Sequence, residues 1–179
     1  MAGSLFNFKW VVILLAIIKV TKGTPHDKWQ KVDEAGKIFI EQEQKFTWFE
    51  ANNECAIRNM TLIAVDTFEK NQVIDSLLRK KFPVSPNLWI GGSDLGQEGK
   101  FIWSSTGKSF EFTNWQHQQP DNSKNDEHCV HYRINSDFEW NDAQCWGKMG
   151  FICEENRFLM EARRDLEIKK NFIEQLFSL

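Results

Sequence analysis

Four cysteines, at positions 55, 129, 145 and 153, all follow a short apolar segment near the N-terminus of this 179-residue chain. An even number of cysteines in an exported protein usually forms disulfides throughout. Spacing alone leaves three connectivities open. A zinc site is the competing interpretation, but zinc favours close cysteine pairs, and the gaps here are wide and irregular. The sequence therefore predicts a small disulfide-bonded extracellular domain.

Residues 1–23 are typical of a secretory signal peptide. Lys9 precedes the apolar run 10–18, Lys19 interrupts it, and the run is too short to span a bilayer. Thr21 and Gly23 offer small residues for cleavage before Thr24. We therefore expect a secreted, soluble mature chain without membrane insertion, with an uncleaved membrane anchor as the alternative.

Composition leaves room for one ordinary domain with short extensions. The chain is 41% hydrophobic and 26% charged, and its net charge is only −3. Since the charges are mixed along the sequence, no basic stripe indicates a nucleic-acid partner. Eight tryptophans and fifteen phenylalanines stand against one tyrosine, which favours a core built on large rings.

The first half of the domain predicts two helices. Residues 24–36 are polar and aperiodic, and we interpret them as a leader. A strand over 37–42 is followed by Thr47 and Glu50, a capping-box pair that opens a helix with Trp48, Ala51 and Cys55 on one face. A strand over 62–65 leads to a second helix starting near Asp66, with Glu69 at the capping position. Its predicted buried stripe comprises Val73, Ile74, Leu77 and Leu78.

From Pro83 onward the pattern changes to short apolar runs separated by turn residues. Strands are predicted over 88–92, 100–103, 127–134, 138–140 and 150–153, which together suit an antiparallel sheet. The domain is therefore expected to be α+β. Residues 104–126 form a long polar loop, and a loop of that length in a compact domain is usually functional or disordered.

Residues 156–179 predict an amphipathic C-terminal helix. One stripe carries Leu159, Ala162, Leu166, Ile173 and Leu176, with Lys169 interrupting it. The stripe is shorter than the three to four heptads that indicate a coiled coil. The favoured interpretation is a helix that packs on its own domain or frays in solvent, and the alternative is a homo-oligomer formed through this helix.

Oxygen-bearing side chains are concentrated at the end of the long loop and in the strands after it. They are Gln119, Asp121, Glu127, Asn141 and Asp142. Three carboxylates and two amides without sulfur or imidazole are the ligand type of calcium, although the spacing is not that of an EF-hand. Pro120 between the first two could adopt the cis form and aim both flanking side chains at one point.

The chain resembles the C-type lectin family from about residue 37 to Glu155. The segment 89–92 (WIGG) is similar to the central strand of that family, Asn114-Trp115 to its loop tryptophan, 140–142 (WND) to its calcium motif and 150–154 (GFICE) to its closing strand. The resemblance implies a short-form C-type lectin-like fold with two helices, antiparallel sheets and a long calcium-binding loop. It also implies the disulfides Cys55–Cys153 and Cys129–Cys145.

In the family, the positions of Gln119, Asp121, Glu127, Asn141 and Asp142 hold the principal calcium, and two sugar hydroxyls complete its coordination. The Gln-Pro-Asp order at 119–121 goes with galactose-type sugars, which would be glycans on cells or microbes. One departure is that no tryptophan directly follows this motif to stack on the sugar. Trp146 is a candidate for that contact, although a core or surface role is favoured.

The resemblance implies a second calcium site as well. Asp94 and Glu98 match two of its ligands, while Asn122 and His128 stand where the strongest sites have carboxylates. Because two charges are missing, we expect weak binding or none. Separately, the sequon at Asn59 predicts N-glycosylation of an exported chain.

No enzymatic role is expected. The sequence contains no nucleophile elbow, HExxH, CxxC or phosphate-binding loop, and the carboxylates that a glycosidase would need are already used as ligands. The leading interpretation is a secreted calcium-dependent lectin of galactose type acting in extracellular recognition or agglutination. The alternative is a protein-binding module of the same fold in which calcium only orders the loop.

Overall fold

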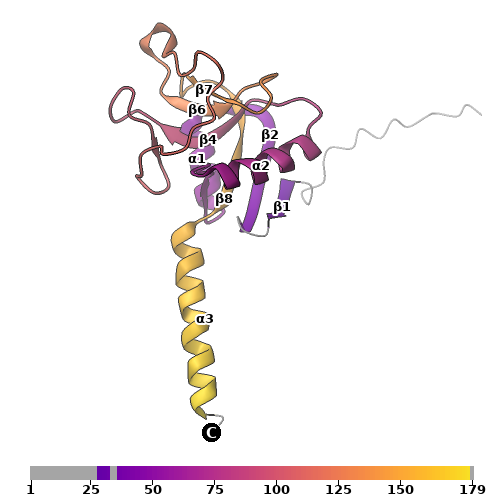
Figure 1. Cartoon of the computed structure of the whole chain (residues 1–179), viewed down its shortest axis with the longest axis vertical. Helices are drawn as coiled ribbons and strands as arrows, with labels where there is room; N and C mark the ends of the chain where they lie inside the picture. The colour runs from indigo at the N-terminus through magenta and orange to yellow at the C-terminus, as the bar shows by residue number, and fades with distance from the viewer. Residues whose placement is uncertain (1–27, 33–35, 178–179) are drawn as a thin grey trace, which may run out of the picture.

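A computed structural model describes residues 28–32 and 36–177 of the chain, so the predicted signal peptide and most of the predicted leader lie outside the described residues. The described elements form an α+β domain, as predicted, from which one long helix extends (Figure 1). In chain order they are β1 (Trp29–Val32), β2 (Gly36–Phe46), α1 (Trp48–Ile57), β3 (Met60–Leu62), α2 (Phe68–Lys81), β4 (Leu88–Ser93), β5 (Ile102–Trp103), the 3-10 turn η2 (Ser123–Asn125), β6 (Cys129–Tyr132), β7 (Trp140–Ala143), β8 (Met149–Glu155) and α3 (Arg157–Phe177).

The sheet has the strand order β1-β2-β8-β4-β6-β7, with β3 pairing with β8 and β5 with β4. All described pairs are antiparallel except β4 with β8, which run parallel at Leu88 and Trp89. The expectation of a purely antiparallel sheet was therefore wrong at its centre. A parallel pair needs a long connection, and the chain between β4 and β8 provides one that includes the long loop.

Helices α1 and α2 each begin at a threonine cap. Thr47 caps α1, because the Glu50 amide donates to its hydroxyl at 3.1 Å and its own amide donates to the Glu50 carboxylate at 2.7 Å, which confirms the predicted capping box. The predicted start of α2 is wrong by one residue. Thr67 is the cap and accepts from the Lys70 amide, while Asp66 lies outside the helix and pairs with Arg157 at 2.8 Å.

Large rings fill the core, as the composition predicts. Trp89, Trp103 and Trp140 are fully buried. Trp140 receives the edges of several neighbouring rings, with Trp103 at 5.7 Å and Trp115 at 5.8 Å between centroids. Because Trp140 is the first residue of β7, this aromatic cluster fixes the position of the strand that carries Asn141 and Asp142.

Both disulfides have the pairing that the resemblance implied. Cys55–Cys153 joins α1 to β8 with the Cα atoms 5.5 Å apart. Cys129–Cys145 joins the start of β6 to the segment after β7, with a Cα separation of 5.1 Å. The second bond therefore encloses the hairpin that bears Asn141 and Asp142, two of the five candidate ligands.

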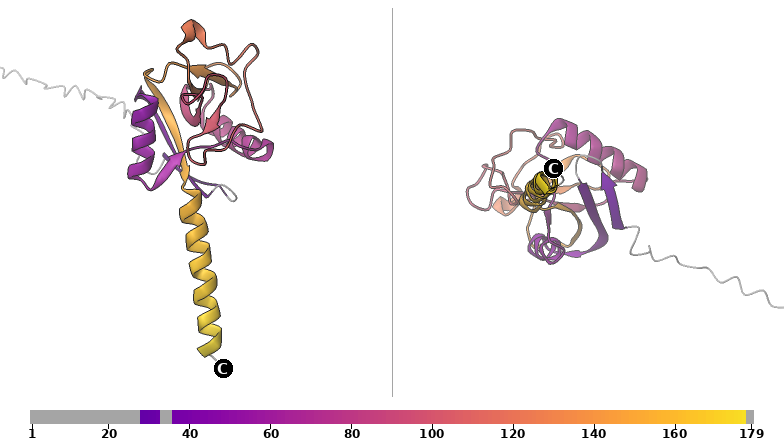
Figure 2. Two further views of the ribbon diagram at one scale, coloured as in Figure 1. Left: turned by 90° about the vertical axis from the view of Figure 1, so that its left-hand side faces the viewer. Right: turned by 90° about the horizontal axis from the view of Figure 1, so that it is seen from below.

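Two terminal segments differ from the sequence prediction. Trp29–Val32, inside the predicted leader, forms β1 and pairs with β2, where the Trp29 ring packs on Phe39 at 5.1 Å. The predicted C-terminal helix is present as α3, but it does not pack on its own domain: it has no buried residue and projects away from the sheet (Figures 1 and 2). Among the described residues, no helix combines the length and apolarity needed to cross a bilayer.

Gly91 allows β4 to approach the backbone that follows β3. A methyl group at Gly91 would lie 2.8 Å from the Leu62 carbonyl oxygen, whereas at Gly96 nothing lies within 4 Å. We predict that Gly91→Ala lowers the free energy of unfolding by about 1–3 kcal/mol through overpacking, and that Gly96→Ala changes it by less than about 0.5 kcal/mol. Chemical denaturation of the oxidised protein measures both, and equal effects of the two variants would contradict the close approach.

Candidate metal centre

The buried carboxylate of Asp142 connects the long loop to the sheet. Asp142 lies in β7, opposite Val130 of β6, and its side chain is inaccessible to solvent. The backbone amide of Asp121 donates to its Oδ1 at 3.2 Å and that of Asn122 donates to its Oδ2 at 2.8 Å. The hairpin thus fixes the loop directly after Pro120, whose peptide bond with Gln119 is cis.

Three carboxylates converge at this point. Asp121, Glu127 and Asp142 each offer one oxygen, and these oxygens lie within 4.8 Å of one another. The Glu127 amide donates to the side chain of Asn122 at 3.1 Å, which brings the end of the loop back to its start. Like charges held together in this way repel each other, and such a group is stabilised by a bound cation.

The ionisation of these groups reflects their surroundings. Burial raises the pKa of the Glu127 carboxyl above its usual range, and the negative charge of Asp142 raises it further. Burial also raises the pKa of Asp142, against hydrogen bonds from the backbone amides of Asn122, Asp121 and Asp142 itself that lower it. In both cases the protein by itself provides too little positive charge to offset the loss of hydration.

The two amide side chains lie beside this group in the sequence and differ in their hydrogen bonding. The Oε1 atom of Gln119 is buried without a hydrogen-bond partner, which is costly for an amide oxygen. The Asn141 amide nitrogen donates to the Asp142 carbonyl, and its Oδ1 accepts from Arg133 at 3.4 Å. A cation that used Asn141 Oδ1 would therefore compete with Arg133.

Arg133 was not among the residues predicted for the site. It is exposed and directly follows β6, and the β6–β7 register places His131 opposite Asn141. The predicted strand 127–134 contained Arg133, but only the observed register of β6 with β7 brings its side chain to Asn141.

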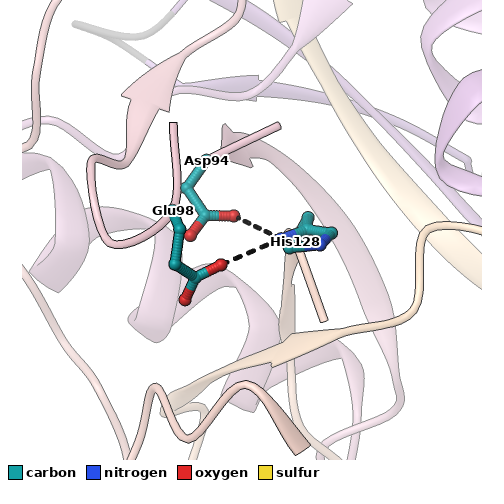
Figure 3. A group of neighbouring side chains, drawn as sticks. All are labelled: Asp94, Glu98 and His128. Atoms are coloured by element: carbon teal, nitrogen blue, oxygen red, sulfur yellow. Dashed lines mark hydrogen bonds and ion pairs between the residues drawn. The ribbon is translucent and has the colours of Figure 1, made fainter. Parts of the chain in front are cut away.

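A second group contains Asp94, Glu98 and His128 (Figure 3). The Nδ1 atom of His128 lies 3.1 Å from Asp94 Oδ1 and 3.4 Å from Glu98 Oε2. Asp94 is buried at the end of β4 and also accepts from the Gly99 amide at 2.8 Å. The imidazole nitrogen thus lies within reach of both carboxylates and occupies the position from which a cation would contact them.

Asn122 makes its hydrogen bonds within the first group. Its backbone amide donates to Asp142 and its side chain accepts from the Glu127 amide, while its predicted role at the second calcium stays a prediction. It therefore supports the loop geometry of the principal group. The left-handed conformation of Asn122, with φ of 41°, is one that asparagine tolerates better than most residues.

Two further residues singled out in the sequence are exposed. Trp146 is 71% exposed and its ring packs on Phe49, with 4.8 Å between centroids. Asn59 lies on the surface just after α1 in a left-handed conformation. This exposure is what a glycosylation acceptor requires, and its occupancy stays a prediction.

Comparison with known proteins identifies the domain. The model of the family "Lectin C-type domain" matches residues 44–155, which include both disulfides and both acidic groups. The chain belongs to the C-type lectin family. Its members and relatives are lectins and not enzymes, which agrees with the expectation of no catalytic role.

Relatives of this C-type lectin occur among insect proteins. "Lectin subunit alpha" of Sarcophaga peregrina is 37% identical over 164 residues, covering 88% of this chain but only 57% of that protein. "Salivary C-type lectin 2" of Aedes albopictus is 34% identical over 136 residues, or 72% of this chain and 89% of the relative. The match thus spans most of the second relative but little more than half of the first.

Solved structures confirm the C-type lectin fold. The carbohydrate-recognition domain of the human scavenger receptor C-type lectin is 28% identical, with a TM-score of 0.63 over 73% of this chain and 97% of that one. The C-type lectin CEL-I from Cucumaria echinata is 25% identical, with a TM-score of 0.60 over 71% of this chain and 94% of that one.

The second group gives a prediction about metal stoichiometry. His128→Asp should create an additional calcium site, because it replaces a cationic or neutral ring between Asp94 and Glu98 by a third carboxylate. Calorimetric titration with calcium should then detect one more bound ion than the unmodified protein takes up. His117→Asp, the same exchange at an exposed position outside the group, should leave the number of ions unchanged. An unaltered stoichiometry for His128→Asp would contradict the prediction.

Proposed function

We propose that this protein is a secreted lectin that binds galactose-type glycans in a calcium-dependent manner. The observation that carries the proposal is the convergence of the Asp121, Glu127 and Asp142 carboxylates. The Oε1 atom of Gln119, two residues before Asp121, is buried without a hydrogen-bond partner. Gln119, Asp121, Glu127, Asn141 and Asp142 would hold the ion. Their donor atoms are all oxygens, as a hard cation requires.

When bound, calcium would supply open coordination positions for two neighbouring sugar hydroxyls. The protein's own groups would complete recognition, because a carboxylate only accepts hydrogen bonds while an amide also donates. Gln119 would donate from its amide nitrogen on one side of Pro120, and Asp121 would accept on the other. This order of donor and acceptor across the proline is the feature that favours galactose-type over mannose-type sugars.

The position of the site suits a shallow surface interaction. Asp121 is exposed, Glu127 is half-buried and Asp142 lies beneath them in the sheet. A monosaccharide here would bury few atoms and displace ordered water, so binding at a single site should be weak, on the order of millimolar. Useful affinity for a cell or microbe would then need several sites acting together.

The alternative is a protein-binding role with a structural calcium. Two observations favour it. No tryptophan directly follows Asp121 to stack on a sugar. The exposed ring of Trp146 packs on the half-buried ring of Phe49 and forms an aromatic surface. Exposed aromatic pairs are common at protein interfaces.

Affinity chromatography separates the two functions. We expect the oxidised protein to be retained on immobilised galactose in calcium and to elute with a chelator, because the chelator removes the ion that the sugar hydroxyls contact. Parallel resins of mannose and fucose test selectivity. Retention on none of the three, together with calorimetric uptake of calcium, would favour the protein-binding alternative, and absence of calcium uptake would refute both.

Exchange of the two groups beside Pro120 tests the basis of selectivity. The double variant Gln119→Glu/Asp121→Asn keeps the same ligand atoms but reverses donor and acceptor, so the preference should shift from galactose toward mannose. The control Gln118→Glu/Asp137→Asn makes the same chemical exchanges outside the site and should keep the galactose preference. Competitive elution with free sugars measures both variants, and unchanged selectivity of the first would refute the assigned roles.

A further inference from the structure

The apolar surface of α3 has no partner within the described part of the chain. Half of the large hydrophobic side chains exposed in that part belong to this one helix: Phe158, Leu159, Met160, Leu166, Ile168, Phe172, Ile173, Leu176 and Phe177. Most of the stability of a protein helix comes from packing its apolar face against a neighbour. Such a concentration of exposed apolar residues marks an interaction surface.

The base of α3 is anchored, so the helix is held away from the domain. The side chain of Asn156 accepts from the Leu159 amide at 3.2 Å, and Arg157 pairs with Asp66 at 2.8 Å. Arg163 lies 3.6 Å from Glu155. Beyond this base the helix projects away from the domain (Figure 2).

We infer that two copies of this chain associate through α3 as an antiparallel helix pair. The seam is the stripe of Leu159, Ala162, Leu166, Lys169, Ile173 and Leu176, which has the three- and four-residue spacing of paired helices. We call it the α3 seam.

The α3 seam is complementary to itself when the two helices run in opposite directions. Reversal places Leu159 opposite the partner copy's Leu176, small Ala162 opposite large Ile173, and Leu166 opposite Lys169. The small Ala162 then leaves room for the larger Ile173 of the other copy, which fills space without overpacking. The Lys169 stem can cover Leu166 of the other copy while its ammonium group reaches solvent.

A parallel pair fits these residues less well. It would place Ala162 against Ala162 and leave a gap, and it would bring the two Lys169 side chains together. The domain also surrounds the base of α3 when viewed along the helix (Figure 2, right), so antiparallel pairing keeps the two domains at opposite ends.

The charges of α3 favour another helix over a lipid surface as the partner. The helix carries five basic and four acidic side chains, as counted over Arg157–Phe177. A helix that lies on an anionic membrane usually has a strongly basic polar face. Lys170 lies 3.9 Å from Glu174 on the same helix, so this pair of charges is already balanced within one chain.

The consequence for binding rests on the proposed function. The loop that carries η2 lies at the end of the domain opposite α3 (Figures 1 and 2). In an antiparallel pair the two candidate sites would therefore point away from each other. Such a dimer bridges two glycan-bearing surfaces, which is the geometry that agglutination requires.

Sedimentation equilibrium of the full chain tests the association without any sugar, so its outcome is independent of the proposed function. We expect a monomer–dimer equilibrium. Ile173→Asp should raise the dissociation constant by at least about tenfold, because it buries an unpaired carboxylate in the seam. The matched control Ile168→Asp places the same exchange outside the seam and should leave the constant unchanged.

Charge at position 166 tests the direction of pairing. In the antiparallel pair Leu166→Glu faces Lys169 and should keep more dimer than Leu166→Lys, which faces the same lysine with a like charge. In a parallel pair each variant would face itself, and both would dissociate alike. A monomeric wild-type protein, or a dimer insensitive to Ile173→Asp, would overturn the inference, and equal constants for the two Leu166 variants would overturn its antiparallel direction. Tryptophan fluorescence checks that the domain of every variant is folded.

Discussion

The hydrogen bonds between the buried Asp142 carboxylate and the amides of Asp121 and Asn122 determine the arrangement of the candidate site. They link the long polar loop to strand β7, whose first residue, Trp140, is packed among aromatic rings. The same carboxylate also faces the oxygens of Asp121 and Glu127. Asp142 therefore serves both as a structural acceptor and as a candidate metal ligand. Because burial raises its pKa and that of Glu127, the group is least stable when ionised without a cation, and calcium would relieve the strain of holding like charges together.

The scaffold explains why this loop can be long without being loose. Cys129–Cys145 encloses β6 and β7, and Gln144 donates to Asp126 at 2.9 Å across the site. Glu127 is tied to Asn122 by its amide. The disulfide holds the hairpin closed, the Gln144 bond joins the loop to the end of that hairpin, and the Glu127 bond closes the loop on itself, so less conformational entropy remains to be lost when a ligand binds. The arrangement is that of a rigid shallow surface and not of a closed pocket.

Much of this could be predicted from the sequence, and the failures have physical causes. Both disulfides, the Thr47–Glu50 cap and the buried strand at Trp89 followed from local pattern or from the resemblance to C-type lectins. The parallel pairing of β4 with β8 could not be predicted, because periodicity reports which face of a strand is buried and not which neighbour it has. The strand at Trp29 was missed because its residues alternate only between exposed and half-buried, and a sequence of that kind resembles a polar leader. In the site, the five candidate ligands were named from the sequence, whereas Arg133 and the true neighbours of Asn122 depend on loop geometry.

In the proposed function, the candidate site binds the sugar, and α3, at the opposite end of the domain, joins two chains. A single shallow site would bind a monosaccharide weakly, since few atoms would be buried. The site could not close tightly around the ion, because coordination positions must stay open for the sugar. Valency is the remaining route to affinity, and it requires a second site at a fixed distance and direction. An amphipathic helix at the opposite end of the domain meets this requirement without touching the site, because the capped base of α3 holds it in place and its apolar stripe is free to pair. In the proposed dimer the apolar residues of α3 would contribute to binding through assembly and not through the stability of the domain.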